Sequence, residues 1–212
     1  MQTSRPTRRE STELTRRRLI DGAIDILRHE GVAAATTGRI ASAAGLKQPS
    51  FYVHFADRDE ILNAAAVEIG QRMIETLQRE LSRVDAADAR RSIRAANAAI
   101  VDTFLGEPEL TRIFLRHRTD DGSVLGRAFR RLLDQARGQI VESVARHSAV
   151  VPRQTVEVYV ELLVAAVLGI LEGLLDGRLT DRAASVDAIS RVTATLLHSL
   201  SNAKSKERRE GK

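Results

Sequence analysis

Residues 36–62 place the strongest constraint on the fold, because four helix boundaries fall within this one short segment. Thr36 and Thr37 can both cap the start of a helix, and Gly45 tolerates the left-handed conformation in which helices often end. Pro49 suits the first turn of a second helix, where its missing N–H would have had no partner. The segment therefore predicts two short helices joined by a tight turn at Gly45.

A third helix is predicted after Asp57, since Asp57 and Glu60 have the spacing of a capping box. Phe51 and Phe55 are four residues apart, which places both on one inward-facing side of the second short helix. The other side carries residues that can make hydrogen bonds, namely Gln48, Ser50, Tyr52 and His54. Two short helices followed by a capped third are the arrangement with which many proteins present a helix to DNA.

Several spaced residues in this segment agree with a known pattern: Thr36-Thr37, Ile40-Ala41, Gly45 and Tyr52-Val53-His54-Phe55. With them, the segment resembles the DNA-binding domain of the TetR family of transcriptional repressors, and Gln48-Pro49-Ser50 is similar to the tetracycline-responsive members. Two residues depart from the family pattern. Lys47 stands where Ser or Thr is common, which removes the usual helix cap, and Arg58 stands where Lys is usual.

The resemblance implies an all-α fold of about nine helices, with an N-terminal three-helix helix-turn-helix domain followed by a larger helical ligand-binding and dimerisation domain. The expected divisions are a flexible basic arm at 1–11, the DNA-binding domain at 12–58, the regulatory domain at 59–202 and a disordered basic tail at 203–212. The implied function is that of a homodimeric repressor, released from a pseudo-palindromic operator by a small-molecule effector.

Side-chain chemistry and the resemblance together indicate two groups of contacts with a double-stranded DNA operator. The residues expected to contact phosphates and fix the register of the helix are Thr36, Thr37, Tyr52, His54 and Arg58. The residues expected to reach base edges are Lys47, Gln48, Ser50 and Arg39.

Positive charge is concentrated near the expected DNA-binding end of the chain. Residues 1–58 hold ten Lys and Arg against six Asp and Glu, residues 203–212 hold five against two, and the remainder holds eighteen against twenty. This distribution is expected if one end meets a polyanion. For the arm, which contains Arg5, Arg8 and Arg9, phosphate contact and solvated disorder are equally compatible with the sequence. For the tail, polar composition favours disorder.

Helical periodicity continues through the rest of the chain, and the alternation typical of strands is missing. Beyond the segment above, helices are predicted at 12–29, from 57 to about 83, and near 86–105, 107–118, 122–147, 153–176 and 182–202. The longest apolar run, Leu162 to Leu171, is half of the ~20 residues that a membrane span needs, which favours a buried helix.

The helix near 153–176 is hydrophobic on almost every side, so it is expected to need a second partner surface. A four-helix bundle formed with a second copy of the chain would supply that surface, and the alternative is a central helix enclosed within its own domain. The interface residues expected for the dimer are Leu163, Val167, Ile170, Leu174, Val192, Leu196 and Leu200.

Catalytic and metal-binding patterns are not found in the sequence. The five histidines are dispersed, and no nucleophile elbow, phosphate-binding loop or cluster of metal-ligating residues is present. Cysteine is absent, which fits a reducing compartment, and no apolar stretch follows the charged N-terminus, so a cytoplasmic location is expected. We expect neither an enzyme nor a resident cofactor or metal.

A small-molecule pocket is expected where polar or aromatic residues interrupt apolar helix faces. The candidates are Asn97, Phe104, His117, Tyr159 and Glu161. Each of them is also compatible with an ordinary core or surface role. Two other classes of function remain open: a TetR-like regulator that has no small-molecule effector and is controlled by a protein partner or by its abundance, and a helical enzyme or scaffold.

Overall fold

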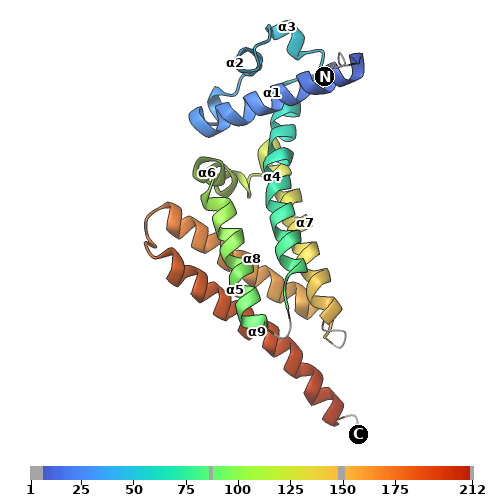
Figure 1. Ribbon diagram of the computed structural model, residues 1–212, viewed down its shortest axis with the longest axis vertical. Coiled ribbons are helices and arrows are strands. Elements are labelled where there is room, and N and C mark those ends of the chain that lie inside the picture. Colours follow the sequence, from blue (N-terminus) through green and yellow to red (C-terminus); the bar gives the residue numbers. More distant parts are fainter. Residues whose placement is uncertain (1–6, 86–87, 148–150, 211–212) are drawn as a thin grey trace, which may run out of the picture. The chain divides into compact units, whose positions relative to one another are not determined.

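The computed structural model describes residues 7–85, 88–147 and 151–210, with side chains described except at 146–147 and 200–210. Every element of regular secondary structure within these residues is a helix, which confirms the predicted all-α fold (Figure 1). The elements are α1 Arg8–Glu30, the 3-10 turn η1 Val32–Ala34, α2 Thr37–Ala43, α3 Gln48–Phe51, α4 Arg58–Ser82, α5 Ala89–Leu105, α6 Pro108–His117, α7 Val124–His147, α8 Arg153–Leu175 and α9 Arg182–Glu210.

Helix α1 begins at Arg8, earlier than the expected start at Thr12. Its first turn is closed by a capping box, in which the Thr7 hydroxyl accepts from the Glu10 N–H at 3.3 Å and the Glu10 carboxylate accepts from the Thr7 N–H at 2.6 Å. The latter bond lowers the pKa of Glu10 below its ordinary value. Residues 8–11, which were predicted to belong to a flexible arm, are therefore helical, while the rest of that arm before Thr7 lies outside the described residues.

Helix α9 continues to Glu210, although the sequence predicted that the last helix ends near residue 202. The backbone of residues 203–210 is thus helical where composition predicted a disordered tail. Residues 211–212 lie outside the described part of the chain. Polar composition is a poor guide here because Ala, Lys, Glu and Arg all have good helix propensity.

The chain divides into two compact units, and the division differs from the expected boundary after residue 58. The first unit contains Met1–Gln71 and Glu109–Arg130, and the second contains Arg72–Pro108 and Arg131–Lys212. The segment 36–62, with its two short helices, is therefore part of a larger unit that also contains α6 and the beginning of α7.

The core of the first unit is built from side chains of the predicted inward faces. Phe51 and Phe55 are 0% and 1% exposed, as expected from their spacing, and their ring centroids lie 5.8 Å apart. Phe114 of α6 and Phe129 of α7 pack edge to face, with ring centroids 5.2 Å apart. Burial of each such ring stabilises the fold by about 2–3 kcal/mol.

The turn between α6 and α7 approaches α7 very closely at Gly126. A Cβ atom added to Gly126 would lie 1.8 Å from the carbonyl oxygen of Asp120 and 2.8 Å from that of His117. The Asp120 side chain helps to hold this turn, since its Oδ1 accepts from the Gly122 N–H at 3.1 Å. A hydrogen bond from Ser123 lowers the pKa of Asp120 below its ordinary value.

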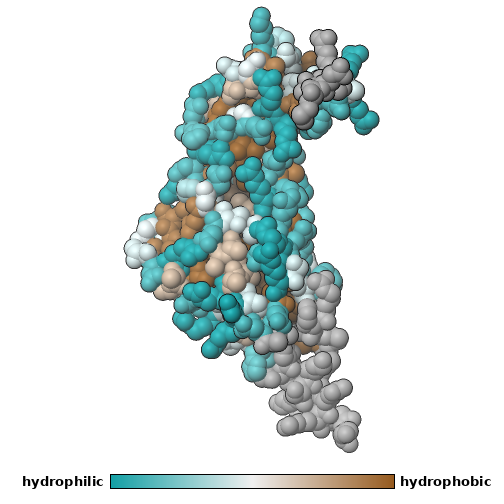
Figure 2. Space-filling model, in the orientation of Figure 1, coloured by the Kyte–Doolittle hydropathy of each residue, from teal (hydrophilic) through white to brown (hydrophobic). Residues whose placement is uncertain are grey.

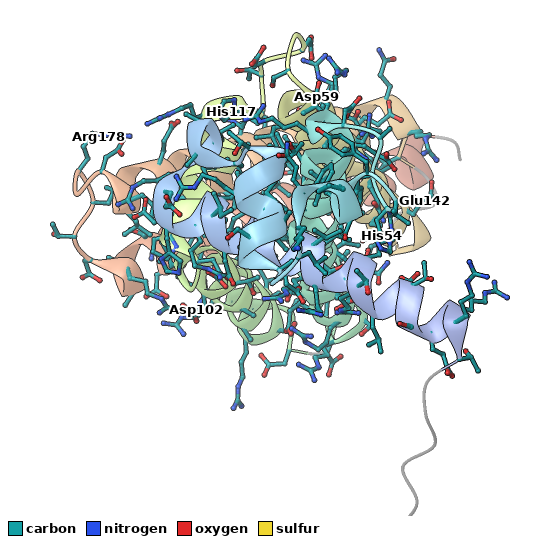
Figure 3. All side chains as sticks on the ribbon, turned by 90° about the horizontal axis from the view of Figure 1, so that it is seen from above. His54, Asp59, Asp102, His117, Glu142 and Arg178 are labelled. Atoms are coloured by element: carbon teal, nitrogen blue, oxygen red, sulfur yellow. The ribbon has the colours of Figure 1, made fainter. Side chains whose placement is uncertain are left out.

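In the second unit, α5 and α8 both pack against α9 (Figure 1). Polar contacts add to this packing: Arg94 donates to Asp187 at 2.5 Å, and Arg182 donates to Asp102 at 2.7 Å. Arg153, at the start of α8, donates to Glu142 of α7 at 2.8 Å, and this bond raises the pKa of Arg153. Asp102 and Glu142 are labelled in Figure 3.

Helix α8 buries only one side within the second unit. Val156 and Val160 pack in a cluster with Val141, whereas the opposite side exposes Val158, Leu162, Ala165 and Gly169. Leu162 is 53% exposed. Hydrophobic surface is visible in Figure 2 where Figure 1 draws α8 and α9. The predicted excess of apolar surface is present in the described structure.

By length and composition, α8 is also the one helix of the described residues that is apolar enough to cross a membrane. Core helices of soluble proteins share this property. Within the second unit, Val156 and Val160 are buried and Arg153 makes ion pairs with Glu142 and Glu157. These contacts fit α8 as a helix packed on other helices of the chain.

The residues expected at the dimer interface fall into three groups. Four of them belong to α8 and are half-buried within the second unit, away from the exposed side of the helix: Leu163, Val167, Ile170 and Leu174. On α9, Val192 is exposed and Leu196 is half-buried. The side chain of Leu200 lies outside the described residues.

Candidate nucleic-acid interface

The two short helices and their turn form as the sequence predicted. Thr36 caps α2, with its hydroxyl accepting from the Arg39 N–H at 3.4 Å, and Gly45 takes the left-handed conformation with φ of 70°. Pro49 lies in the first turn of α3, and Lys47 precedes that helix without a side-chain cap. The absence of the usual cap at Lys47 is thereby confirmed.

Arginines from the flanking helices hold the short helices by their C-terminal ends. Arg18 of α1 donates to the carbonyl of Ala44 at 2.5 Å, where α2 ends. Arg16 donates to the carbonyl of His54 at 3.0 Å, just after α3, and its guanidinium lies 4.2 Å from the centre of the Phe55 ring. Carbonyls at the C-terminal end of a helix lack hydrogen-bond donors within the helix and carry partial negative charge. A guanidinium supplies both a donor and a positive charge.

Arg58 of α4 also donates to backbone carbonyls, in this case those of the turn before α2. Its Nε donates to the carbonyl of Ala35 at 2.7 Å, and its Nη2 donates to that of Val32 at 2.6 Å, closing the turn η1. Arg58 was predicted to contact a phosphate, but in the structure two of its N–H groups donate to backbone carbonyls. Periodicity could not reveal this role, because the acceptors are backbone carbonyls.

Replacing Arg58 with Lys is expected to lower the free energy of unfolding by about 1–3 kcal/mol, because a single ammonium cannot reproduce the fork that reaches two carbonyls. Urea denaturation followed by circular dichroism measures the change. Arg90→Lys, at an exposed position on α5, is the matched control and should change stability by less than about 0.5 kcal/mol. Equal effects of the two substitutions would contradict the structural role of Arg58.

Thr37 connects α2 to the predicted DNA-facing side of α3. Its hydroxyl accepts from Nε2 of Gln48 at 3.1 Å and lies 3.4 Å from the hydroxyl of Tyr52, which is 54% exposed. Gln48 and Tyr52 are four residues apart, so both lie on one row of the helix. The structure thus brings three of the sequence-predicted residues together in one hydrogen-bonded group.

The other predicted DNA-binding residues surround this group. Arg39 forms an ion pair with Glu30, and Lys47 is exposed. Ser50 and His54 are half-buried, and His54 is labelled in Figure 3. All of them belong to the first unit, together with Thr36 and Arg58.

Helix α4 starts close to where the capping-box pattern placed it. The Asp57 carboxylate accepts from the Glu60 N–H at 2.8 Å, as predicted. In a full capping box the Glu60 carboxylate would accept from the N–H of Asp57. Here it accepts from the N–H of the preceding residue, Ala56, at 2.6 Å. Both bonds fix the path of the chain between α3 and α4.

The candidate effector residues are not assembled into one group by any contact described. Asn97 is 8% exposed, and its Nδ2 donates to Ser190 at 3.3 Å and to Thr193 at 3.4 Å. Glu161 is exposed and pairs with Arg137 at 2.7 Å. Both residues therefore have polar partners within the chain, and their proposed contact with an effector stays a prediction.

Of the remaining candidates, Tyr159 is half-buried and packs against the cluster of Val141, while Phe104 is half-buried on α5. His117 belongs to the first unit, and its Nδ1 lies 3.9 Å from Asp120. The described residues contain no group of three or more His, Asp or Glu side chains arranged to hold a metal ion.

Comparisons with known proteins point to one family. Residues 19–65 match the family model of bacterial regulatory proteins, tetR family. The nicotine-responsive transcriptional repressor HdnoR of Paenarthrobacter nicotinovorans is 33% identical over 96 residues, which are 45% of this chain and 46% of that protein. The class D tetracycline repressor protein of Escherichia coli is 38% identical over 56 residues, 26% of each chain. The chain thus spans less than half the length of these relatives.

A similar fold extends over most of the chain in solved structures. The fatty acid degradation regulator FadR from Bacillus halodurans superposes with a TM-score of 0.66 at 14% identity, covering 86% of this chain and 94% of that one. At such low identity the likeness concerns the fold.

Proposed function

Because the chain belongs to the TetR family of transcriptional regulators, we propose that it is a homodimeric repressor that binds a pseudo-palindromic operator. The observation that carries the proposal is the group of Thr37, Gln48 and Tyr52, which orients two polar side chains on the exposed part of α3. Preorganised side chains lose little conformational freedom when they bind, so they suit recognition of a fixed pattern of base edges.

The proposed contacts follow from side-chain chemistry and position. Gln48 can make a bidentate pair with adenine, and Lys47, Ser50 and Arg39 lie on the adjoining surface for further base contacts. The residues proposed to contact phosphates are Thr36, Thr37, Tyr52 and His54. Arg58 contributes indirectly, by holding the turn before α2.

Gln48→Ala and Tyr52→Ala are expected to weaken DNA binding in different ways. Gln48→Ala removes a base contact, so discrimination at one base pair of each half-site should fall by about 1–3 kcal/mol. Tyr52→Ala removes a phosphate contact and should weaken binding to all sequences similarly. Selection of bound sequences from random DNA with the purified protein defines the operator, and titration of its single-base variants at fixed salt measures both effects.

Two results would contradict these roles. A Tyr52→Ala protein that changes its preferred base, or a Gln48→Ala protein that loses affinity uniformly, reverses the assignments. Failure of the wild-type protein to enrich any palindromic sequence contradicts the proposed function itself. Loss of affinity as salt is raised, with the preferred site retained, separates specific DNA binding from the basic surface of an unrelated enzyme or scaffold.

Dimerisation is proposed through the exposed sides of α8 and α9. The exposed row of α8 is apolar, and the exposed row of α9 consists of small or apolar residues: Ala188, Val192, Thr195 and Ser199. Two copies of such a helix pair can form an isologous four-helix bundle, which removes the apolar surface from water. Leu162, at 53% exposure, does not fit the alternative of a helix enclosed within its own domain.

A small-molecule effector is proposed from the relatives, since HdnoR is described as nicotine-responsive. The effector of this chain would act by favouring a dimer in which the two copies of α3 are wrongly spaced for the operator. By linkage, such a compound must bind the operator-bound dimer more weakly than the free dimer, by the factor with which it weakens DNA binding. Equal affinity for both forms across a compound library would favour control by a protein partner or by abundance.

A further inference from the structure

The helical path of α3 continues beyond Phe51, which fixes the directions of all side chains up to Phe55. The N–H groups of His54 and Phe55 both donate to the carbonyl of Phe51, at 2.9 and 3.0 Å. With about 100° between successive residues, the segment 48–55 has four rows of residues spaced four apart. These rows are Phe51 with Phe55, Gln48 with Tyr52, Ser50 with His54, and Pro49 with Val53.

Three of the rows have evident roles. Phe51 and Phe55 are buried in the core of the first unit. Gln48 and Tyr52 contact Thr37 on one flank, and the half-buried Ser50 and His54 form the other flank.

The fourth row, Pro49 with Val53, forms the outermost side of the recognition helix. It lies about 160° around the helix from the buried row of Phe51 and Phe55. Both residues are exposed, and Val53 is 77% exposed, the highest value among the large hydrophobic side chains that the structure describes. The part of α3 that would reach deepest into a groove is therefore apolar.

On the floor of the major groove, the thymine C5-methyl is the apolar group that side chains recognise. We propose that Pro49 and Val53 pack against thymine methyl groups, so that each operator half-site requires thymine where this row faces the base pairs. The proposal rests on the proposed function and adds a residue pair that reads sequence by apolar contact beside the hydrogen bonds of Gln48.

Duplex DNA fits this row better than a protein partner does. Residues 1–58 carry ten Lys and Arg against six Asp and Glu, and the exposed Lys47 directly precedes the helix. The flanking residues Gln48 and Tyr52 are polar and suit base edges and phosphates. Two small apolar side chains cover far less than the ~800 Å² per partner of an ordinary protein interface.

The test replaces each thymine of the selected operator by uracil, which removes the C5-methyl and leaves every hydrogen-bonding group in place. Uracil at the position that faces Pro49 and Val53 is expected to lower the affinity of the wild-type protein about fourfold per half-site. This is the value for burying one methyl group. Val53→Ala is expected to bind the thymine operator about fourfold more weakly per half-site and to bind the uracil operator no more weakly than the wild type does. Fluorescence anisotropy at fixed salt provides both affinities for a double-mutant cycle.

Val67→Ala is the matched control, because Val67 is 57% exposed on α4 and outside this row. It should leave the ratio of thymine to uracil affinities unchanged. A wild-type protein indifferent to uracil at every position, or a Val53→Ala protein with the same thymine preference as the wild type, overturns the proposal while leaving operator binding intact. Failure to bind any operator overturns the proposed function and this inference together.

Discussion

Replacing Leu162 with Glu is expected to convert the proposed dimer into a monomer and to lower operator affinity by on the order of 100-fold. Leu162 lies on the exposed apolar side of α8 and is 53% exposed in the single chain. A carboxylate there stays solvated in the monomer, whereas in a dimer it would be buried without a partner, at a cost of several kcal/mol. Sedimentation velocity measures the change in mass, and anisotropy with the selected operator measures the change in affinity.

Val67→Glu is the control for this substitution, because Val67 of α4 is exposed to a similar degree, 57%. It should leave the mass and the operator affinity of the protein unchanged apart from a small electrostatic effect. Thermal unfolding of both variants tests whether each chain still folds. A folded Leu162→Glu protein that remains dimeric would place the interface on another surface.

Replacing Gly126 with Ala is expected to destabilise the first unit by about 3 kcal/mol or more. The added Cβ would lie 1.8 Å from the carbonyl oxygen of Asp120, and backbone on both sides would have to move. The carbonyl of His117, at 2.8 Å from the same Cβ, leaves little room for that movement. Urea denaturation monitored by circular dichroism gives the change in the free energy of unfolding.

Gly138→Ala is the matched control on the same helix. A Cβ at Gly138 meets no atom within 4 Å, and alanine is a better helix former than glycine. This substitution should therefore leave stability unchanged or raise it by about 0.5–1 kcal/mol. If the two alanine variants unfold at the same urea concentration, the close approach at Gly126 is not a constraint on the fold in solution.

Local signals were sufficient to predict the helix-turn-helix. Thr36 caps α2, Gly45 is left-handed, and Pro49 lies in the first turn of α3, because each choice depends on backbone geometry within a few residues. A local signal of the same kind also marks the start of α1. Thr7 and Glu10 have capping-box spacing, which explains why α1 begins before Thr12.

Burial and partners that depend on contacts between distant parts of the sequence could not be predicted in the same way. Helix α8 is apolar on most sides, so its sequence could not show that Leu163 and Val167 lie half-buried while Leu162 faces solvent. The role of Asn97 was equally open, since its partners Ser190 and Thr193 belong to α9, far away in the sequence. Val53 was not among the predicted DNA contacts, because an apolar side chain carries no local signal that it is exposed, as Val53 is at 77%.

The arginine contacts of the short helices have a consequence for the substitutions that they tolerate. Arg16, Arg18 and Arg58 donate to the backbone carbonyls of His54, Ala44 and Ala35. Every residue type carries this carbonyl, so replacing the side chain of an acceptor leaves the acceptor atom in place. The three arginines, in contrast, are the side chains that these contacts require.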